Sequence, residues 1–203
     1  LHDCATFIEQ QLRNLGYNAH RMDYQASRRI VSNVEAELQG SNPKLPPLII
    51  GAHYDTVAYS PGANDNASAV ATALAIAASL AGEKPLRSVR FVFFANEEAP
   101  HFMTPAMGSL VYANACRERG ERLLGAIILE TIGCYTEEPG TQHYPKPIAA
   151  FFPNRGNFVA FVANLRSRHF LHRTVRAFRR FTFFPTEGIA APESLRDICR
   201  SDN

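Results

Sequence analysis

Three short apolar segments, each followed by acidic or histidine side chains, constrain the fold of this chain more than any other feature. The segments and their polar followers are 48–52 with His53 and Asp55, 88–95 with Glu97 and Glu98, and 124–130, which ends on Glu130. Short, continuous apolar runs are typical of strands covered on both faces of a sheet. The sequence therefore predicts three core strands that carry polar groups at their carboxyl ends.

Helical patterns separate these strands. Residues 66–81 are rich in alanine and apolar nearly all round, which predicts a buried helix, with Asp65 or Asn66 as its cap. Pro105 suits the first turn of a second helix that runs to about Arg119. The alternation of strand and helix predicts parallel strands with right-handed crossovers. We expect an α/β fold of three layers, with a mixed, mostly parallel central sheet and helices on both faces.

The two flanks of this core differ in character. Before it, residues 3–15 predict a helix, and 18–24 and 29–38 predict strands near a sheet edge. After it, residues 136–155 predict a long loop. Residues 157–180 begin apolar and become an arginine-rich helix, whereas 182–203 have mixed character. We interpret the whole chain, 1–203, as one catalytic domain.

Composition excludes several classes of function. A chain of 203 residues with 46% hydrophobic residues is long enough for one domain with a substantial core, and its net charge of +2 does not indicate nucleic acid as a partner. The arginine-rich helix invites an RNA or membrane interpretation, but it lacks interleaved stacking aromatics, so a solvated helix face is favoured. No apolar run is long enough to span a membrane.

The termini and the cysteines leave the compartment open. The chain starts at Leu1 without a visible signal peptide, which suggests a processed or trimmed product. The four cysteines are far apart, without a CxxC pair: Cys4, Cys116, Cys134 and Cys199. Free or buried thiols are favoured, with one or two disulfides as the alternative.

The polar groups at the strand ends suit a zinc site. Sites in open α/β sheets gather at the carboxyl ends of strands, and zinc takes histidine nitrogen and carboxylate oxygen. Asp65, in a turn before the alanine-rich helix, adds a further carboxylate. Two zinc ions with Asp65, Glu98, Glu130 and a hydroxide would balance in charge. Glu97 is then free to take a proton from water, and Asp55 can orient the ring of His53.

Each of these residues also has an ordinary structural interpretation. His53 with Asp55 is compatible with a capped loop, adjacent glutamates are usually a solvated face, and Glu130 suits an edge charge. Three successive core strands that all end in carboxylates are not explained in this way, because burying such groups without partners is costly.

Five motifs resemble one family, the zinc-dependent aminopeptidases related to bacterial leucyl aminopeptidases. The motifs are Gly-Ala-His-Tyr-Asp-Thr-Val (51–57), Pro-Gly-Ala-Asn-Asp-Asn-Ala-Ser (61–68), Phe-Ala-Asn-Glu-Glu (94–98), Met-Gly-Ser (107–109) and Leu-Glu-Thr-Ile-Gly (129–133). The superfamily includes glutaminyl cyclases and catalytically silent ectodomains of transferrin-receptor type. The resemblance covers nearly the whole chain, and the combined set is highly specific.

The resemblance implies a role for each residue at the strand ends. His53 and Glu130 would hold one zinc ion, Glu98 the other, and Asp65 would bridge them. Glu97 would be the general base and then the acid that protonates the leaving amine, and Asp55 would orient His53. The peptide bond between Asp65 and Asn66 would be cis.

Two departures from the family pattern affect the metal count. Many relatives have Asp at the position of Glu130. The last histidine ligand of the family lies beyond a segment that Ser201-Asp202-Asn203 resembles. We therefore expect a chain that is truncated at both ends and incomplete at its C-terminus. Two zinc ions are expected in the complete enzyme, and one or none in this chain.

Other candidate ligands are weaker. His101 and His143 are interpreted as rim residues that touch substrate, and His169 and His172 as surface residues on the arginine-rich helix. Cys134, close to Glu130, is interpreted as a structural thiol, because the rest of the set is oxygen and imidazole.

Three functions follow from these residues and the resemblance. The first is hydrolysis of the N-terminal residue from a peptide with a free N-terminus. The second is glutaminyl-peptide cyclisation with one zinc ion, although cyclases usually lack the equivalent of His53. The third is a non-catalytic binding ectodomain or an inactive fragment. We expect no nucleic acid partner and no membrane span. The resemblance favours a secreted or periplasmic protein, and the oligomeric state is left open.

Overall fold

The computed structural model describes residues 1–142, 144 and 152–192. Two compact units divide the chain, Leu1–Thr131 and the residues that follow from Ile132. The first unit contains the five motif residues at the strand ends together with Asp65, so the candidate site lies within one unit.

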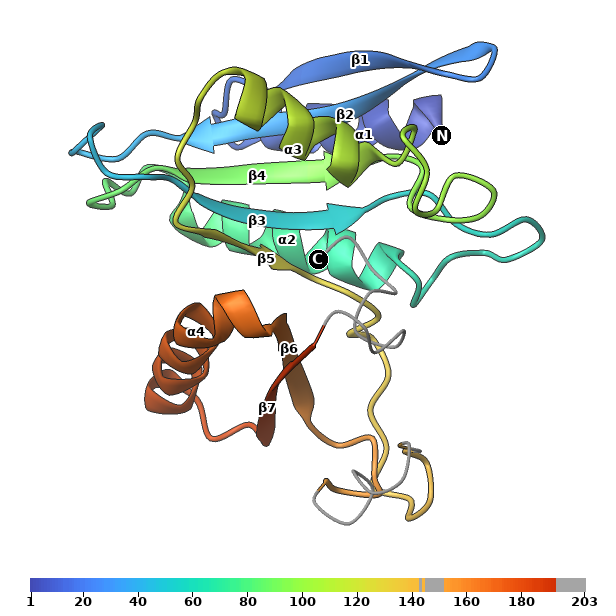
Figure 1. Cartoon of the computed structure of the whole chain (residues 1–203), viewed down its shortest axis with the longest axis vertical. Helices are drawn as coiled ribbons and strands as arrows, with labels where there is room; N and C mark the ends of the chain where they lie inside the picture. Colours follow the sequence, from blue (N-terminus) through green and yellow to red (C-terminus); the bar gives the residue numbers. More distant parts are fainter. Residues whose placement is uncertain (143, 145–151, 193–203) are drawn as a thin grey trace. The chain divides into compact units, whose positions relative to one another are not determined.

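The first unit is built on a five-stranded sheet (Figure 1). In chain order its strands are β1 (His20–Ala26), β2 (Arg29–Leu38), β3 (Leu48–His53), β4 (Val89–Phe94) and β5 (Gly125–Ile128). In space the order is β1-β2-β4-β3-β5. β3 pairs in parallel with both β4 and β5, whereas β2 is antiparallel to β1 and β4. The mixed, mostly parallel sheet that the sequence predicts is confirmed, with β2 as the one reversed strand.

Helices cover both faces of this sheet, as predicted (Figure 1). α1 (His2–Asn14) and α2 (Ala67–Leu80) pack on one face, and α3 (Gly108–Glu118) packs on the other. The predicted helix over 66–81 is present as α2, but it is less buried than predicted. Only its stripe of Ala69, Ala73 and Ala77 is buried, because a single face of the helix meets the sheet.

The start of α3 also differs from the prediction. The helix begins at Gly108 and not at Pro105, because turns precede it and the Gly108 N–H donates to the carbonyl of Ala95 at 2.8 Å. A Cβ at position 108 would lie 2.3 Å from that carbonyl oxygen, so only glycine allows the approach. This contact ties the start of α3 to the end of β4.

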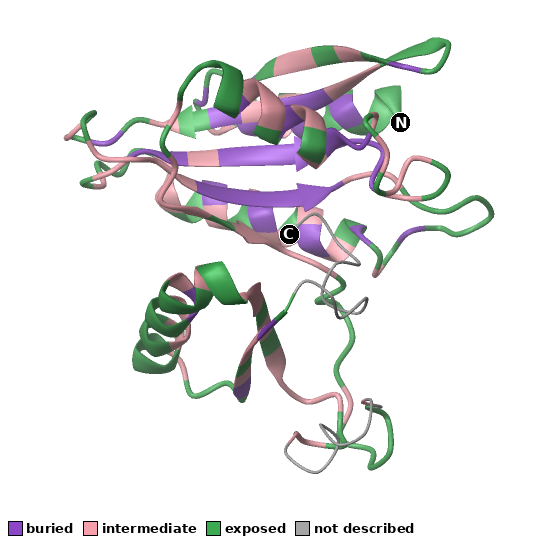
Figure 2. Cartoon of the chain, viewed as in Figure 1, coloured by how far each residue is buried: buried purple, intermediate pink, exposed green. Residues whose placement is uncertain are grey.

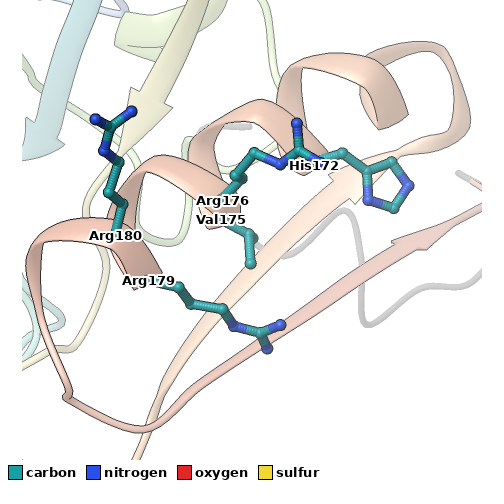
Figure 3. A pocket seen from close by; sticks show the side chains of 5 residues that line it. All are labelled: His172, Val175, Arg176, Arg179 and Arg180. Carbon is teal, nitrogen blue, oxygen red and sulfur yellow. The ribbon is translucent and has the colours of Figure 1, made fainter.

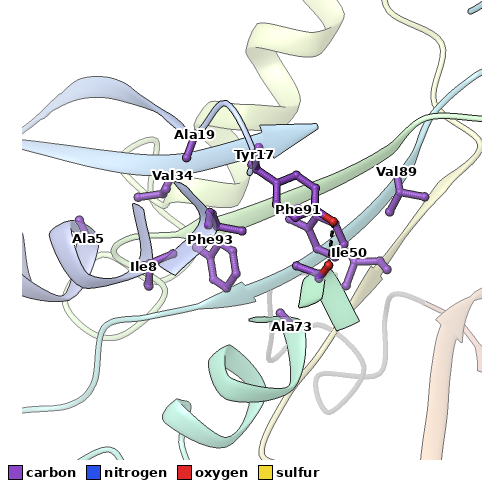
Figure 4. Close-up of a cluster of buried hydrophobic side chains, with 13 residues drawn as sticks. Ala5, Ile8, Tyr17, Ala19, Val34, Ile50, Ala73, Val89, Phe91 and Phe93 are labelled. Atoms are coloured by element: carbon purple, nitrogen blue, oxygen red, sulfur yellow. Dashed lines mark hydrogen bonds between the residues drawn. The ribbon is translucent and has the colours of Figure 1, made fainter. Parts of the chain in front are cut away.

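β4 forms the centre of the core (Figures 2 and 4). Phe91 and Phe93 point to the face covered by Ile8 of α1 and by Ala73 of α2. On the opposite face, Phe94 packs edge-to-face with Tyr112 of α3 at a centroid distance of 5.9 Å. Because both faces are covered, every residue of β4 except the half-buried Arg90 is buried, which explains its largely apolar sequence.

The second unit contains a β-α-β arrangement. β6 (Val159–Asn164) and β7 (Thr186–Ala191) pair in parallel, joined by the short 3₁₀ turn η2 (Leu165–Ser167) and the helix α4 (Arg168–Phe181). The predicted arginine-rich helix is confirmed. β7 was not predicted, because Thr-Glu-Gly-Ile-Ala-Ala has neither a continuous nor an alternating apolar pattern.

No helix in the described part of the chain is long and apolar enough to cross a membrane. The three cysteines within it carry free thiols: Cys116 is buried, and Cys4 and Cys134 are exposed. Cys199 lies outside the described residues.

Candidate metal centre

His53, the last residue of β3, stands at the centre of the candidate site. Its side chain is only 1% exposed. The ring nitrogen Nδ1 lies 3.1 Å from the backbone carbonyl of Asp55 and 3.6 Å from its carboxylate oxygen Oδ1. Asp55 therefore faces this nitrogen with two acceptors, which leaves Nε2 directed to the other side.

Two carboxylates face Nε2 of His53 at distances that suit a shared metal ion. Asp65 Oδ1 lies 3.2 Å away and Glu130 Oε1 lies 3.5 Å away. The candidate ligand atoms of these three residues all lie within 4.8 Å of one another. With ligand bonds of about 2.0 Å, two ligands of tetrahedral zinc are separated by about 3.3 Å. The donor types and their spacing therefore fit zinc.

The carboxylate of Asp55 also holds the loop after β4. Its two oxygens accept the backbone N–H groups of Glu97 and Glu98, each at 3.0 Å. Burial alone would raise the pKa of Asp55, but His53 and these two N–H groups outweigh it, so the pKa is lowered. Asp55 is thus held as a carboxylate that connects the ends of β3 and β4.

Glu97 and Glu98 follow β4 and have different surroundings. Glu97 is 6% exposed, and its Oε2 lies 3.9 Å from Nε2 of His53. Glu98 is half-buried and lies outside the group of three candidate ligands. Burial and the charge of Asp65 raise the pKa of Glu98, because the ionised forms of these two carboxylates repel each other.

The remaining candidate ligands come from loops next to α2 and after β5. Asp65 immediately precedes the start of α2, and the Asp65–Asn66 peptide bond is cis, as the resemblance implies. Glu130 lies two residues beyond β5, which ends at Ile128. The loops that carry these ligands thus start from neighbouring parts of the same sheet edge.

Asn66 is a residue whose role the sequence did not indicate. It occupies the N-cap position of α2, but its side chain makes no capping hydrogen bond. Instead it bonds to the backbone of Leu129 and Thr131, on either side of Glu130. An Asn beside Asp65 was the only signal, and nothing in the spacing connects position 66 with position 130.

The charge around His53 is strongly negative. Burial lowers the pKa of its imidazole, but the Asp55 and Glu130 carboxylates and the charge of Glu97 outweigh this effect and raise the pKa to about 11. In the metal-free chain a proton thus supplies the positive charge at this point. A metal ion is the natural replacement for that proton, since metal binding requires the neutral ring.

Two further residues that the sequence singled out, His101 and Cys134, are described by the structure and are not part of this group. His101 lies in the turn after Glu98, where its backbone N–H donates to the Glu98 carbonyl at 2.9 Å. His143 lies outside the described residues. Cys134 is exposed and is not among the candidate ligands.

A surface hollow of about 430 Å³ lies on α4, in the second unit (Figure 3). It is lined by His172, Val175, Arg176, Arg179 and Arg180. None of the candidate ligands contributes to it. The exposed side chains of this helix face are mostly basic, in agreement with the solvated face that the sequence favours.

Comparisons with known proteins find relatives of similar sequence. The uncharacterized protein YfbL of Escherichia coli K12 is 36% identical over 175 residues, which is 82% of this chain and 53% of the relative. An aminopeptidase of Pseudomonas aeruginosa is 32% identical over 128 residues, or 63% of this chain and 19% of the relative. The chain thus spans about half the length of the first relative and much less of the second.

Solved structures share the fold at low sequence identity. LapB from Legionella pneumophila superposes with a TM-score of 0.71 at 16% identity, and the match covers 98% of this chain and 50% of the LapB chain. A glutaminyl cyclase from Tannerella forsythia has a TM-score of 0.62 at 16% identity, with 99% of this chain and 74% of its own covered.

The match to a protein family is broader than any of the five motifs. Residues 33–163 match Peptidase family M28, a span that begins in β2 and ends in β6 and includes every candidate ligand. The resemblance seen in the sequence is therefore confirmed, and this chain belongs to peptidase family M28.

Proposed function

We propose that this chain carries the catalytic centre of a zinc-dependent aminopeptidase. One observation carries the proposal: His53 Nε2, Asp65 Oδ1 and Glu130 Oε1 converge at the spacing of zinc ligands, beside the buried carboxylate of Glu97. Zinc-dependent exopeptidases and aminopeptidases among the proteins of similar sequence or fold support it.

His53, Asp65 and Glu130 would hold the ion. Three protein ligands are the number typical of catalytic zinc sites, which also take water or substrate. A bound zinc ion acidifies its water and polarises a substrate carbonyl. The residues around it supply what else the hydrolysis of a peptide bond requires.

Glu97 is the group best placed to move the proton. Its carboxylate is buried next to the ligands, with Oε2 3.9 Å from Nε2 of His53. It takes a proton as the water oxygen attacks the carbonyl carbon. It then gives that proton to the leaving nitrogen as the C–N bond breaks, which regenerates the carboxylate.

Asp55 has a positioning role in this scheme. Its backbone carbonyl and its carboxylate face Nδ1 of His53, and the carboxylate also accepts the N–H groups of Glu97 and Glu98. One side chain thereby sets the relative position of a ligand and the general base.

A second ion is part of the proposal for the complete protein. Asp65 would bridge the two ions, because its side chain is half exposed and its charge acts on Glu98 as well as on His53. Glu98 would be a ligand of the second ion. The acidic surroundings also suit the α-ammonium group of a peptide with a free N-terminus.

The direct test is an activity assay of the metal-loaded chain. Release of p-nitroaniline from amino acid p-nitroanilides should require Zn²⁺ and stop with a chelator. Glu97→Gln should lower kcat by about 10²- to 10⁴-fold while zinc stays bound. Glu83→Gln, at an exposed position after α2, serves as the matched control and should keep full activity.

Three results would contradict the proposal. Turnover that survives the chelator would exclude a metal mechanism. Cyclisation of an N-terminal glutaminyl peptide without release of amino acids would instead support a cyclase. Zinc binding without any turnover in either assay would support a chain that binds metal but does not catalyse.

A further inference from the structure

Asn66 connects two of the candidate metal ligands. It directly follows Asp65 in the chain, and its side chain is buried, with 2% of the residue exposed. Its Nδ2 group donates to the carbonyl of Leu129 at 3.2 Å, and its Oδ1 accepts from the N–H of Thr131 at 3.1 Å. The two partners are the residues immediately before and after Glu130.

These two bonds use both ends of one amide. Leu129 and Thr131 are separated from Asn66 by 63 and 65 positions in the sequence. A carbonyl and an N–H on opposite sides of Glu130 are therefore held at fixed points relative to Asp65. Since both ends of a planar amide are used, the Glu130 backbone has little freedom to shift or rotate.

The backbone conformation of Thr131 needs support from its surroundings, and the two hydrogen bonds of Asn66 adjoin it. Thr131 has a φ of +41°, a conformation that a β-branched residue rarely adopts. Such a conformation persists only where the surrounding structure imposes it. The bond from the Thr131 N–H to Asn66 is one contact that holds this turn, and the Glu130 side chain lies on the side of His53, with Oε1 3.5 Å from Nε2.

We infer that Asn66 is a positioning residue for the metal centre, which sets the place of Glu130 relative to Asp65. Asn66 is not one of the three candidate ligands, and both ends of its amide are bonded to the backbone. It acts through the ligand whose two neighbours it binds, in the way that outer groups around metal sites tune affinity. This inference rests on the proposed zinc site and adds a residue that controls it.

Zinc affinity, measured without any assay of activity, tests the inference. Purified metal-free chain is titrated with Zn²⁺ against a chromophoric chelator. Asn66→Ala should weaken binding by about 10- to 100-fold, the usual effect of losing a group that orients a ligand. The double variant Asn66→Ala with Glu130→Gln should bind no more weakly than Glu130→Gln alone, because Asn66 acts through Glu130.

Asn33 provides a matched control. It is fully buried and makes the same two kinds of bond, from Nδ2 to the Gly108 carbonyl at 2.8 Å and from the Ala95 N–H to Oδ1 at 3.0 Å. Asn33→Ala should lower the melting temperature of the metal-free chain about as much as Asn66→Ala. It should leave the affinity for the first equivalent of Zn²⁺ within about twofold, because neither of its partners adjoins a ligand of the three-residue group.

The outcomes separate this inference from the proposed function. If the unaltered chain binds no Zn²⁺, the proposed site fails and the inference fails with it. If the chain binds Zn²⁺ but Asn66→Ala binds equally well, or loses affinity additively with Glu130→Gln, only the inference is overturned. Should Asn66→Ala not fold, Asn66→Ser, whose shorter side chain cannot reach both backbone partners, replaces it with the same expectations.

Discussion

Two groups of charged side chains lie along β4 of the first unit, and their charges are organised in opposite ways. At the start of the strand, Arg90 pairs with Glu37 and Glu121 at 2.9 Å and with Glu35 at 3.7 Å, and Arg119 also pairs with Glu121. We call this set the arginine cluster. Beyond the end of the strand lies the metal group, which consists of His53, Asp55, Asp65, Glu97, Glu98 and Glu130.

The metal group contains five carboxylates and one imidazole. Among the described residues, the ion pairs of this group converge on His53. In the arginine cluster, two guanidinium groups face three carboxylates, so acid and base nearly balance. The difference suggests that one cluster stabilises the fold by itself, whereas the other is completed by a cation from solution.

The rise in Tm on zinc binding should depend on the metal group and not on the arginine cluster, and this is the largest difference expected between them. At a free concentration 100 times the dissociation constant, binding adds about 2.7 kcal/mol, which for a chain of this length raises Tm by about 5–10 °C. Asp65→Asn should abolish the shift, whereas Arg90→Met should lower Tm yet keep the shift. Thermal melts with and without Zn²⁺ measure both. An equal shift in Asp65→Asn would break the comparison.

Loss of the central cation of the arginine cluster should have the next largest effect. Arg90→Met leaves three glutamates without their shared partner and should cost about 2 kcal/mol. Urea unfolding of the metal-free chain measures the loss. Arg28→Met, at an exposed position, is the control and should change stability by less than about 0.5 kcal/mol. A loss no larger than that of the control would mean that the cluster contributes little.

Neutralising a carboxylate of the metal group should stabilise the metal-free chain, whereas Arg90→Met destabilises it. Burial and the charge of Asp65 raise the pKa of Glu98, so its ionised form opposes folding at neutral pH. Glu98→Gln should therefore stabilise the metal-free chain, by about 0.5 kcal/mol after solvent screening. Urea unfolding with a chelator, at low and at high salt, tests this expectation. The gain should shrink in high salt, and a destabilised variant would contradict it.

The acid limb of the stability profile should show a similarly small effect. Arg119 lowers the pKa of Glu121 most, burial opposes this, and Arg90 lowers it further, to about 2. Its unfolded pKa is near 4.3, so its contribution is fully present above that pH and is lost as the pH falls toward 2. Glu121→Gln should remove up to about 1 kcal/mol at pH 7 and nothing near pH 2. Urea midpoints across this range measure the difference, and a constant difference would disprove the linkage.

Much of the fold follows from local patterns in the sequence. The apolar runs of β3 and β4 predict covered strands, and the five-strand sheet places them at its centre. The predictions for α2 and α3 were less accurate because they depended on neighbours. Ala71 and Ala75 are exposed since no element of the unit covers that side of α2, and α3 starts at Gly108 since Ala95 bonds to it there.

The candidate ligands could be named from the sequence because of where strands end. His53 ends β3 and Glu130 follows β5, and the carboxyl ends of parallel neighbours meet at one edge of a sheet. Their roles in zinc binding and catalysis remain predictions. Asn66 could not be found in this way, since its partners are defined by a contact between two loops and not by any periodicity.

The sequence by itself determined the strands of the first unit, the residue types at their ends and the family. These depend on local properties, namely apolar periodicity and the chemistry of side chains next to a strand end. Only the tertiary structure decided which atoms meet. His53 Nε2 lies 3.2 Å from Asp65 Oδ1, the Asp55 carboxylate accepts the N–H of Glu97, and Asn66 accepts the N–H of the residue after Glu130. Contacts between residues distant in the chain depend on how strands pair and loops close, and no single segment of sequence encodes them.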